Sequence, residues 1–502
     1  MKSLLLFTLN SRYTHTSIAL RSLYANLKDL QQNAQIVEHT INESLSSVAE
    51  SLLDKKADII GMGVYIWNAS QIASLGRIIK KLSPETIIVL GGPEVSHEPF
   101  RVDFGFADHI VQGEGEVSFY ELCKDLIDGK KRDRTIRSSI PDVKKLALPY
   151  RFYSDEDIKN RYIYVEASRG CPFECEFCLS SIDEKVRAFD LDLFIGELEG
   201  LWDRGAREFK FIDRTFNLNI KTANTLLEYF LAKEEEFFVH FEVVPDHFPH
   251  SLREKIALFK KGSLQFEIGI QTLNPRIAKN ISRNLDLAKI RDNIAFLEQT
   301  SAHIHLDLII GLPDEDLASF GKNLDELVAL SGSEIQLGVL KKLSGTTLNR
   351  HDIEHGMVYS DEPPYEVMQT SHLSYKELFV MKRFARYWDL FYNSGNFKKS
   401  IKLLWDEKGV KGSVFEAFYS FAIWFYDKVG STHQIALDRQ AELLFDYLCS
   451  DQKRDKQAVA EVLLADLLRI KGRKVPHFLR EFATDLKPTK GVTKNSYTKR
   501  QS

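Results

Sequence analysis

Three cysteines mark the stretch that decides the fold of the central region, Ser168-Arg169-Gly170-Cys171-Pro172-Phe173-Glu174-Cys175-Glu176-Phe177-Cys178. Their C-x3-C-x2-C spacing lets three thiolates bind three irons of a four-iron four-sulfur cluster. No fourth cysteine follows nearby, so one iron would stay open to bind a further ligand directly. The pattern therefore predicts a 4Fe-4S site at Cys171, Cys175 and Cys178.

Two other uses of cysteine fit this stretch less well. A structural zinc site closes its shell with four Cys or His ligands, usually in two close pairs, and no second pair is present here. The histidines His240, His247 and His250 lie far downstream and would have to be brought in by long-range folding. Disulfides are disfavoured because only five cysteines occur in 502 residues and no signal peptide precedes them. We expect a reducing, cytoplasmic location.

The composition predicts an enzyme-sized globular chain of two to four domains, since 44% of its residues are hydrophobic and 11% are aromatic. Apolar runs such as Ile304 to Leu312 are too short to span a bilayer, so no membrane partner is expected. A net charge of -4 gives no general attraction to nucleic acid, which makes that partner unlikely. The only basic excess is the stretch Lys487 to Arg500, which is typical of a solvated tail.

The first 145 residues alternate short apolar runs with amphipathic helical stretches, which predicts a doubly wound parallel sheet. The strands are expected at Leu4 to Leu9, Ile36 to His39, Ile59 to Tyr65, Ile87 to Leu90 and His109 to Val111. Ligands of such sheets collect at the loops after the carboxyl ends of the strands. Here those loops are rich in glycine and polar or aromatic residues, such as Gly91-Gly92-Pro93-Glu94 and Gly113-Glu114-Gly115-Glu116.

The central region predicts six repeated strand-helix units and hence a partial (β/α)6 barrel. Its strands are expected at Tyr162 to Ala167, Glu208 to Ile212, Phe238 to Val244, Gln265 to Ile270, His303 to Ile310 and Glu334 to Leu340. The helices are expected at Leu191 to Trp202, Lys221 to Glu235, Leu252 to Lys261, Arg276 to Gln299 and Leu317 to Leu330. The three cysteines follow the first of these strands, at the end of the barrel where active sites lie.

From about Ser344 the chain becomes helical and rich in aromatic residues, as in Leu378 to Tyr392 and Val414 to Tyr426. Aromatic residues at helical spacing are more often core than cavity lining. We therefore divide the chain into an α/β domain (1–145), a linker (146–160), the partial barrel (161–343), a helical domain (344–482) and a basic, disordered tail (483–502).

The first two domains resemble the cobalamin-binding-domain-containing radical S-adenosylmethionine enzymes. The resemblance of the first domain rests on its loops and implies a cobalamin site. The residues it assigns there are Asn10, Ser11, Tyr13, Tyr65, Trp67, Asn68, Gly91, Gly92, Glu94, Gly113, Glu114, Gly115 and Glu116. The D-x-H-x-x-G motif that supplies a lower axial histidine is absent, so a corrinoid is expected to bind without a histidine ligand.

In the second domain, the resemblance rests on the cysteine motif and on segments such as Phe211 to Asn217, Glu267 to Thr272 and Leu308 to Pro313. It implies S-adenosylmethionine contacts at Phe177, Asp213, Asn217, Glu267, Gly269, Gln271 and Gly311. Acceptors such as Asp213, Glu267 and Gln271 suit the amine and the ribose hydroxyls of that ligand. Arg214 stands where the family usually has a second acidic residue, which leaves the partner of the amine open. Arg283 could reach the carboxylate or ribose, although an exposed helical arginine is the commoner case.

For such an enzyme the resemblance implies methylation of an unactivated carbon of an unknown substrate, with electrons supplied by a reductant such as flavodoxin or ferredoxin. Two alternatives stay open. One is a radical enzyme with a vestigial cobalamin domain that catalyses rearrangement, cyclisation or dehydrogenation. The other is a non-enzymatic corrinoid or iron-sulfur sensor.

Overall fold

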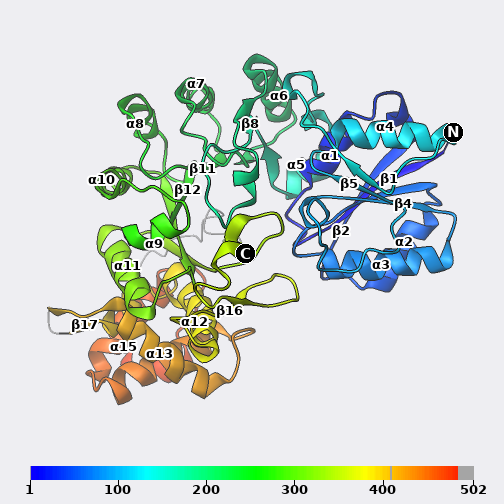
Figure 1. Ribbon diagram of the computed structural model, residues 1–502. Helices are drawn as coiled ribbons and strands as arrows, with labels where there is room; N and C mark the ends of the chain where they lie inside the picture. The colour runs from blue at the N-terminus through cyan, green and yellow to red at the C-terminus, as the bar shows by residue number, and fades with distance from the viewer. Residues whose placement is uncertain (1, 408–409, 484–502) are drawn as a thin grey trace.

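The computed structural model describes residues 2–407 and 410–483 of the 502-residue chain. It contains two six-stranded parallel sheets followed by a helical region. The basic tail expected from the sequence lies outside the described residues, apart from Ala483. In Figure 1 the blue and cyan first sheet stands beside the green second sheet, and the yellow-to-red helices pack below the second sheet.

The first sheet has the strand order β2-β1-β3-β4-β5-β6 and is parallel throughout. Its strands are β1 (Leu4–Asn10), β2 (Ala34–Thr40), β3 (Ile59–Gly63), β4 (Ile87–Gly91), β5 (His109–Gln112) and β6 (Thr135–Arg137). Its helices are α1 (Ile18–Ala25), α2 (Leu45–Asp54), α3 (Ala69–Leu82) and α4 (Glu116–Ile127), with short helices η1 (Lys28–Asn33) and η2 (Pro93–Val95).

Strand β1 shows why this sheet is covered on both faces. Every residue of its run Leu4 to Asn10 is buried. Successive side chains of a strand point to opposite faces. Leu4 and Leu6 join the core under α1 and α4, whereas Leu5 and Phe7 join the core under α2 and α3. The continuous apolar run therefore becomes a central strand with helices on both sides (Figure 1).

Strand β6 is a sixth strand that the sequence analysis did not predict, and the expected linker after it contains short helices. This short edge strand follows a run of charged residues, which obscured it in the sequence. Charged residues are common at the edges of sheets. The segment 146–160 contains the short helix η4 (Tyr150–Phe152) and α5 (Asp155–Asn160), preceded by η3 (Val143–Lys145). Asp157 of α5 accepts hydrogen bonds from Arg21 at 2.7 Å and from Arg161 at 2.9 Å, so this segment is anchored to the first domain by buried charges.

The second sheet has the order β14-β13-β12-β11-β10-β7 and is also parallel. Its strands are β7 (Ile163–Val165), β10 (Glu208–Phe211), β11 (Phe238–Val243), β12 (Leu264–Gln271), β13 (His303–Ile310) and β14 (Glu334–Val339). Helices α6 (Leu191–Asp203), α7 (Ile220–Leu231), α8 (His250–Ile256), α9 (Pro275–Asn280), α10 (Leu287–Leu297) and α11 (Leu317–Leu330) cover its outer face. The partial six-unit barrel predicted from the sequence is confirmed.

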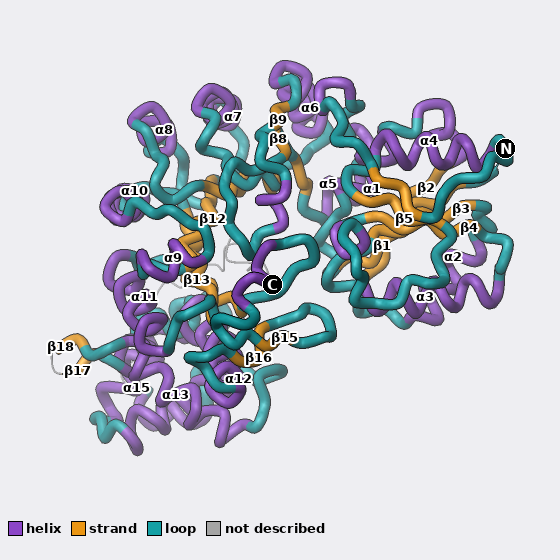
Figure 2. Tube along the Cα trace, in the orientation of Figure 1, coloured by secondary structure: helices purple, strands orange, loops and turns teal. Residues whose placement is uncertain are grey.

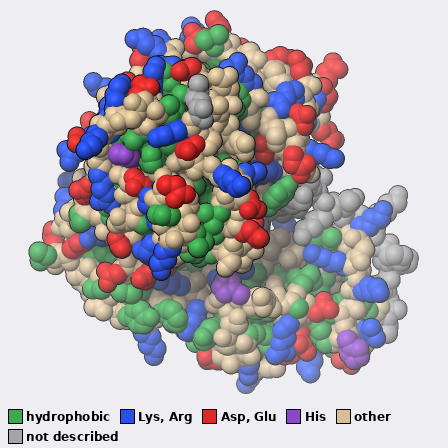
Figure 3. Space-filling view, turned by 90° about the vertical axis from the view of Figure 1, so that its right-hand side faces the viewer, with side chains coloured by type: hydrophobic (Ala, Val, Ile, Leu, Met, Phe, Trp, Pro, Cys, Tyr) green, Lys and Arg blue, Asp and Glu red, His purple; other side chains and the backbone are tan. Residues whose placement is uncertain are grey.

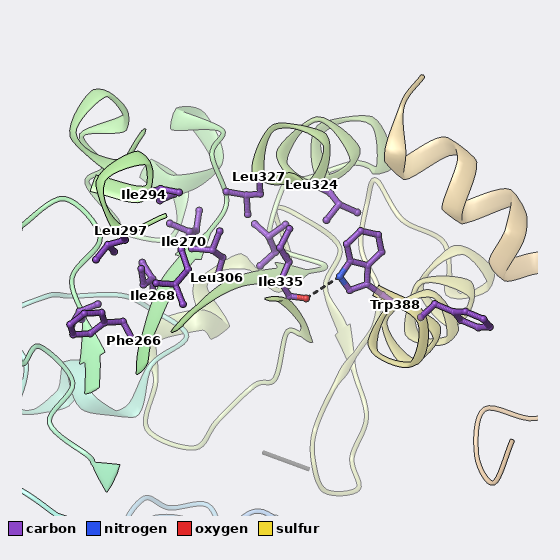
Figure 4. Packing of buried hydrophobic residues seen from close by; sticks show 14 of the residues in the cluster. Phe266, Ile268, Ile270, Ile294, Leu297, Leu306, Leu324, Leu327, Ile335 and Trp388 are labelled. Atoms are coloured by element: carbon purple, nitrogen blue, oxygen red, sulfur yellow. Dashed lines mark hydrogen bonds between the residues drawn. The ribbon is translucent and has the colours of Figure 1, made fainter. Parts of the chain in front are cut away.

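The barrel strands alternate between an apolar outer face and a polar inner face. Phe266, Ile268 and Ile270 of β12 are buried under the helices, as Figure 4 shows together with Ile294 and Leu297 of α10. The alternate positions on the inner face are polar in most strands: Lys210, His240, Glu242, Gln265, Glu267, His305 and Asp307. A partial barrel therefore presents a polar concave surface, where a polar ligand can bind.

The predicted helix Arg276 to Gln299 is wrong in one respect, because the structure breaks it into α9 and α10. Ser282 has a φ of 55°, which no helix accommodates. The side chain of Asp286 then accepts the Lys289 amide and starts α10 as a new N-cap. The break places Arg283 in a loop rather than on an exposed helix.

The helical region that follows contains α12 (Tyr375–Trp388), α13 (Val414–Val429), α14 (Leu437–Asp446) and α15 (Lys456–Leu468). Shorter elements are β15 (Val358–Tyr359), β16 (Val367–Gln369), β17 (Asp406–Glu407), β18 (Val410–Lys411), η6 (Thr347–His351), η7 (Asp389–Asn393), η8 (Ser400–Leu404), η9 (Tyr447–Asp451) and η10 (His477–Phe482). Figure 2 shows these helices gathered against the barrel edge.

This region protects the open edge of the second sheet. Trp388 donates its indole N–H to the Ile335 carbonyl at 3.0 Å, which Figure 4 shows as a dashed line. The Asn393 amide accepts from Ile335 N and donates to the Ile335 carbonyl, each at 3.0 Å. Both backbone groups of Ile335 in edge strand β14 are thereby satisfied by side chains. Most of the aromatic residues expected to be core are buried, such as Phe384 and Phe418, whereas Phe379 is exposed.

Candidate active site between the two sheets

The cysteine loop leaves the carboxyl end of β7 through a small hairpin of β8 (Ser168–Arg169) and β9 (Arg187–Ala188), with the short helix η5 (Leu179–Ile182) inside it. Gly170 between β8 and Cys171 has a φ of 90°, and a side chain there would meet the Lys185 carbonyl at 2.3 Å. The Cys171 amide donates to the Asp183 carbonyl at 2.9 Å. Glycine is therefore required for the loop to close on itself before the first cysteine.

Cys171 and Cys175 are buried and Cys178 is half-buried. Burial raises the pKa of the Cys171 and Cys175 thiols, and the Arg283 guanidinium acts in the opposite direction on Cys175. Among the described residues, the one group of three His, Cys, Asp or Glu donors close enough to hold a single ion lies elsewhere, at His303, His305 and Glu334. The three cysteines are thus not gathered closely enough to hold a single ion, and their use for a larger cluster stays a prediction.

Arg283 is the site residue that the sequence pattern undervalued. Its Nη1 lies 3.6 Å from Cys175 Sγ, and its Nη2 donates to the Gly269 carbonyl. Gln271, which has a φ of 68°, brings its amide next to Gly269 as well. These residues form a polar wall beside the cysteine loop that suits the carboxylate and hydroxyl groups of a ligand. The sequence analysis favoured an exposed helical position for Arg283, and the break between α9 and α10 is what brings it to the site.

Two of the predicted ligand contacts, Asp213 and Asn217, form hydrogen bonds within the protein. Asp213 accepts from the Ala167 amide at 2.9 Å and from the Ser168 hydroxyl at 2.7 Å, and burial raises its pKa to about 7. The Asn217 amide donates to the Val244 and His247 carbonyls and accepts from the Val244 amide. Both side chains fix loops at the carboxyl edge of the barrel.

The other predicted contacts are spread over the same edge. Glu267 faces the barrel interior, with its Oε2 3.3 Å from His240 Nε2. Arg214 forms a two-point ion pair with Glu242, and this carboxylate raises the pKa of the guanidinium. Gly311 has a φ of 84°, and a side chain there would meet Val367 of β16 at 2.6 Å, so this glycine allows the helical region to approach. Phe177 is half-buried against the core.

A cavity of about 310 Å³ opens at the carboxyl edge of the first sheet and is closed by the barrel residues Glu166, Arg169 and Ile212. Of the residues assigned to cobalamin, seven line it: Tyr65, Gly91, Gly92, Gly113, Glu114, Gly115 and Glu116. Its other walls come from helix α1, including Ala19 and Leu23, and from Val89 and Phe119. The sequence pattern did not indicate these cavity-lining residues, because apolar residues of a cavity wall and of an ordinary core have the same spacing in the sequence.

A second cavity of about 800 Å³ adjoins the first, since Gly92, Pro93, Gly113 and Glu114 line both. Its far wall is Leu179, Ile182 and Asp183 of the cysteine loop. The two cavities therefore connect the edge of the first sheet to the loop that carries the cysteines. A large flat ligand in this space would touch both domains.

The remaining six residues assigned to cobalamin do not line the 310 Å³ cavity. Trp67 stacks on Tyr65 at 4.5 Å and donates to the Leu9 carbonyl, and Asn68 caps the Tyr65 amide. Asn10 donates to Glu38, and the Tyr13 hydroxyl donates to Glu156. Glu94 is buried next to Tyr365, and Ser11 is half-buried. Most of these residues shape the loops rather than face the cavity.

Glu114 and Glu116 join the two domains. Arg169 lies 2.8 Å from a carboxylate oxygen of each, and Arg187 also pairs with Glu114. Both arginines belong to the hairpin around the cysteine loop. The glutamates assigned to cobalamin thus orient that hairpin against the cavity.

In the described part of the chain, no helix has the length and apolar character needed to cross a membrane. On the face shown in Figure 3, Lys and Arg side chains are interspersed with Asp and Glu.

Three family models match consecutive parts of the sequence. Residues 5–123 match the B12 binding domain, residues 165–327 match the radical SAM superfamily, and residues 353–502 match a protein family of unknown function, DUF4080. The first two matches coincide with the two parallel sheets described above.

Curated relatives include an uncharacterised methyltransferase, PH0819, of Pyrococcus horikoshii, which is 25% identical over 68% of this chain and 80% of that protein. The cobalamin-dependent radical SAM methyltransferase TokK of Streptomyces tokunonensis is 23% identical over 56% of this chain. The chain spans about half of TokK, with 47% of its length matched.

Solved structures share the fold. The cobalamin-dependent S-adenosylmethionine radical enzyme OxsB aligns over 93% of this chain and 75% of its own, with a TM-score of 0.59 and 15% identity. The methyltransferase TsrM of Kitasatospora setae aligns over 72% of this chain and 82% of its own, with a TM-score of 0.57 and 16% identity. The chain therefore combines a B12 binding domain with a radical SAM domain, in the same order as its two parallel sheets.

Proposed function

We propose that this protein binds a 4Fe-4S cluster, S-adenosylmethionine and cobalamin, and transfers a methyl group to an unactivated carbon of a substrate. The observation that carries the proposal is the pair of connected cavities between the carboxyl edges of the two sheets. One domain supplies the glycine-rich loops and the other supplies the cysteine loop, so cofactors bound to each would face a common space. The names of TokK and TsrM, both methyltransferases, support this choice of reaction.

In this proposal the three cysteine thiolates hold the cluster, and Arg283, Gln271 and the Gly269 backbone bind the polar end of S-adenosylmethionine. When bound, these two cofactors supply one-electron cleavage of a sulfonium and hydrogen abstraction from a substrate. Arg283 contributes a fixed positive charge beside Cys175, which suits the ligand carboxylate. The Arg214–Glu242 ion pair provides a second set of charges near the cysteine loop, since the Arg214 charge acts on the Cys171 thiol.

The corrinoid is proposed to lie over Gly91, Gly92 and Gly113, with part of it inside the 310 Å³ cavity. His97 lines the adjoining 800 Å³ cavity, and the described lining of the 310 Å³ cavity contains no histidine. The same lining is largely apolar, with Leu23, Val89 and Phe119, and would exclude water from the buried part of the ligand. Electrons would come from a flavodoxin or ferredoxin, and the chemistry would require a reducing compartment.

The proposal is tested on anaerobically purified protein that is reconstituted with iron and sulfide, mixed with hydroxocobalamin and desalted. About four irons and one corrinoid per chain are expected, followed by methyl transfer from labelled S-adenosylmethionine once a substrate is found. Four irons without corrinoid would favour the vestigial-domain alternative. Formation of 5'-deoxyadenosine under reducing conditions would argue against a sensor.

Variants separate the cysteine motif from other thiols. Cys175→Ala should lose the cluster and the cleavage of S-adenosylmethionine while the first sheet stays folded. Cys449→Ala, which removes a half-buried thiol in η9, should change neither. A Cys175→Ala protein with full iron content and full cleavage would contradict the assignment.

A further inference from the structure

Three metal-binding side chains converge at the amino ends of β13 and β14, the opposite end of the barrel from the cysteine loop. His303 is the first residue of β13 and His305 is two positions later, so both side chains point to the same inner face. Glu334 opens β14 and is the register partner of His305. The sheet register thus brings the two histidines of one strand next to the carboxylate of the neighbouring strand.

His305 Nε2 has more close polar neighbours than one imidazole nitrogen can hydrogen-bond. His305 Nε2 lies 3.0 Å from His303 Nε2, 3.3 Å from Glu334 Oε2 and 2.7 Å from Gln265 Nε2. A neutral imidazole nitrogen carries either one proton or one lone pair, so it can satisfy only one of these neighbours. A cation at the centre would satisfy the lone pairs of both imidazoles and the carboxylate together.

The separations also match those of a metal-ligand set. With metal–ligand bonds of about 2.0–2.1 Å, a tetrahedral site places its donor atoms about 3.3 Å apart. The distances are 3.0 Å between the two imidazole nitrogens, 3.3 Å from His305 Nε2 to Glu334 Oε2, and 3.5 Å from His303 Nε2 to Glu334 Oε1, so each imidazole faces a different oxygen of the carboxylate. Little movement of the side chains is needed to accept an ion.

We propose that His303, His305 and Glu334 bind one divalent transition-metal ion such as zinc. Two imidazoles and one carboxylate favour a cation of this class over magnesium or calcium, which prefer oxygen ligands alone. The side chain of His305 is 8% exposed, whereas those of His303 and Glu334 are 40% and 25% exposed. The site is therefore anchored on one side and open to solvent on the other. That leaves a position for water or for a coordinating group of a substrate.

Gln265 lies beside the proposed metal site, where its side-chain amide can act as a further ligand. It pairs in register with His303, and its side-chain amide contacts His305. Rotating the amide by half a turn would present its oxygen instead of its nitrogen. The neighbouring His240–Glu267 pair continues the polar inner face toward the centre of the barrel, and Glu267 is the register partner of His305. The negative charge of Glu267 adds to the attraction for a cation.

The test uses full-length, tag-free protein whose cluster has been reconstituted, so that the cysteines are occupied. The protein is incubated with zinc sulfate and desalted, and zinc and iron are measured separately by mass spectrometry. We expect one zinc per chain in the parent, at least a tenfold weaker zinc affinity in Glu334→Gln and in His303→Ala, and unchanged iron content in both. Absorption of a cobalt(II)-substituted sample would report the nitrogen and oxygen ligands.

His250→Ala is the matched control, because it removes a histidine that is 87% exposed on α8 and far along the chain from the three ligands. It should keep its zinc. The proposal is overturned if the parent retains no zinc, or if Glu334→Gln and His303→Ala retain as much as the parent. Should His303→Ala fold poorly, as judged by circular dichroism, Glu334→Gln decides alone, since it preserves the shape of the side chain.

Discussion

Glu176, between the second and third cysteines, offers a direct way to test how the cysteine loop is held. Its side chain is 4% exposed and accepts hydrogen bonds from Ser282 at 2.5 Å and from Arg350 at 2.5 and 2.7 Å. His351 Nε2 lies 2.8 Å away and is equally buried. The helical region thus holds the cysteine loop through one buried carboxylate.

We predict that Glu176→Gln loosens this loop. A hydrogen bond to a charged group contributes about 1.5–3 kcal/mol, and breaking a buried ion pair costs about 3–5 kcal/mol. The Arg350 side chain is 56% exposed, which reduces the free energy that its ion pair with Glu176 contributes. We therefore take about 2 kcal/mol as the minimum that all the interactions of Glu176 contribute to the closed loop. That free energy corresponds to about a 30-fold shift in the equilibrium between closed and open loop.

The assay is the rate at which an iron chelator removes iron from the reconstituted, anaerobic protein. If iron is lost through the open loop, the rate should rise by about 30-fold in Glu176→Gln, from the same free energy. Glu174→Gln is the matched control, since it changes an exposed carboxylate in the same loop. Equal iron-release rates in Glu176→Gln and the parent would refute the idea that this clamp stabilises the cluster loop.

Three further predictions follow from single sites. Ala19 on α1 lines the 310 Å³ cavity and is exposed. Ala19→Trp should therefore weaken corrinoid binding at least tenfold with little change in thermal stability. The control Ala19→Ser should bind the corrinoid normally. Arg283→Met should raise the KM for S-adenosylmethionine while iron content stays unchanged, and an unaltered KM would remove Arg283 from the binding site. Burial raises the pKa of Glu315 to about 7, so the folded chain keeps a proton that the unfolded chain loses above pH about 4. Stability should therefore fall by about 1.4 kcal/mol per pH unit from this group between pH about 4 and 7. Glu315→Gln keeps the acceptor oxygen for Thr272 and Asn323 and should remove that slope in denaturant titrations; parallel curves for variant and parent would contradict it.

The sequence alone was enough to predict both parallel sheets and the position of the cysteine loop. Continuous apolar runs such as Leu4 to Leu9 can be buried on both faces only in a sheet with helices on each side. Runs with alternating polar residues, such as Gln265 to Ile270, indicate strands with one face turned to a polar interior. The cysteine spacing is a local property, so it needs no folding to be recognised.

The tertiary structure decided what depends on groups far apart in the chain. Asp213 and Asn217 look like ligand contacts in the sequence, yet their hydrogen bonds go to residues 167, 168, 244 and 247 of neighbouring strands and loops. Arg283 reaches Cys175 only because Ser282 ends a helix that the periodicity continued. The convergence of His303, His305 and Glu334 depends on the register between two strands, which hydrophobic patterning does not specify for polar side chains. Local patterns therefore determined the elements of this protein, and long-range packing determined which of its polar residues face one another.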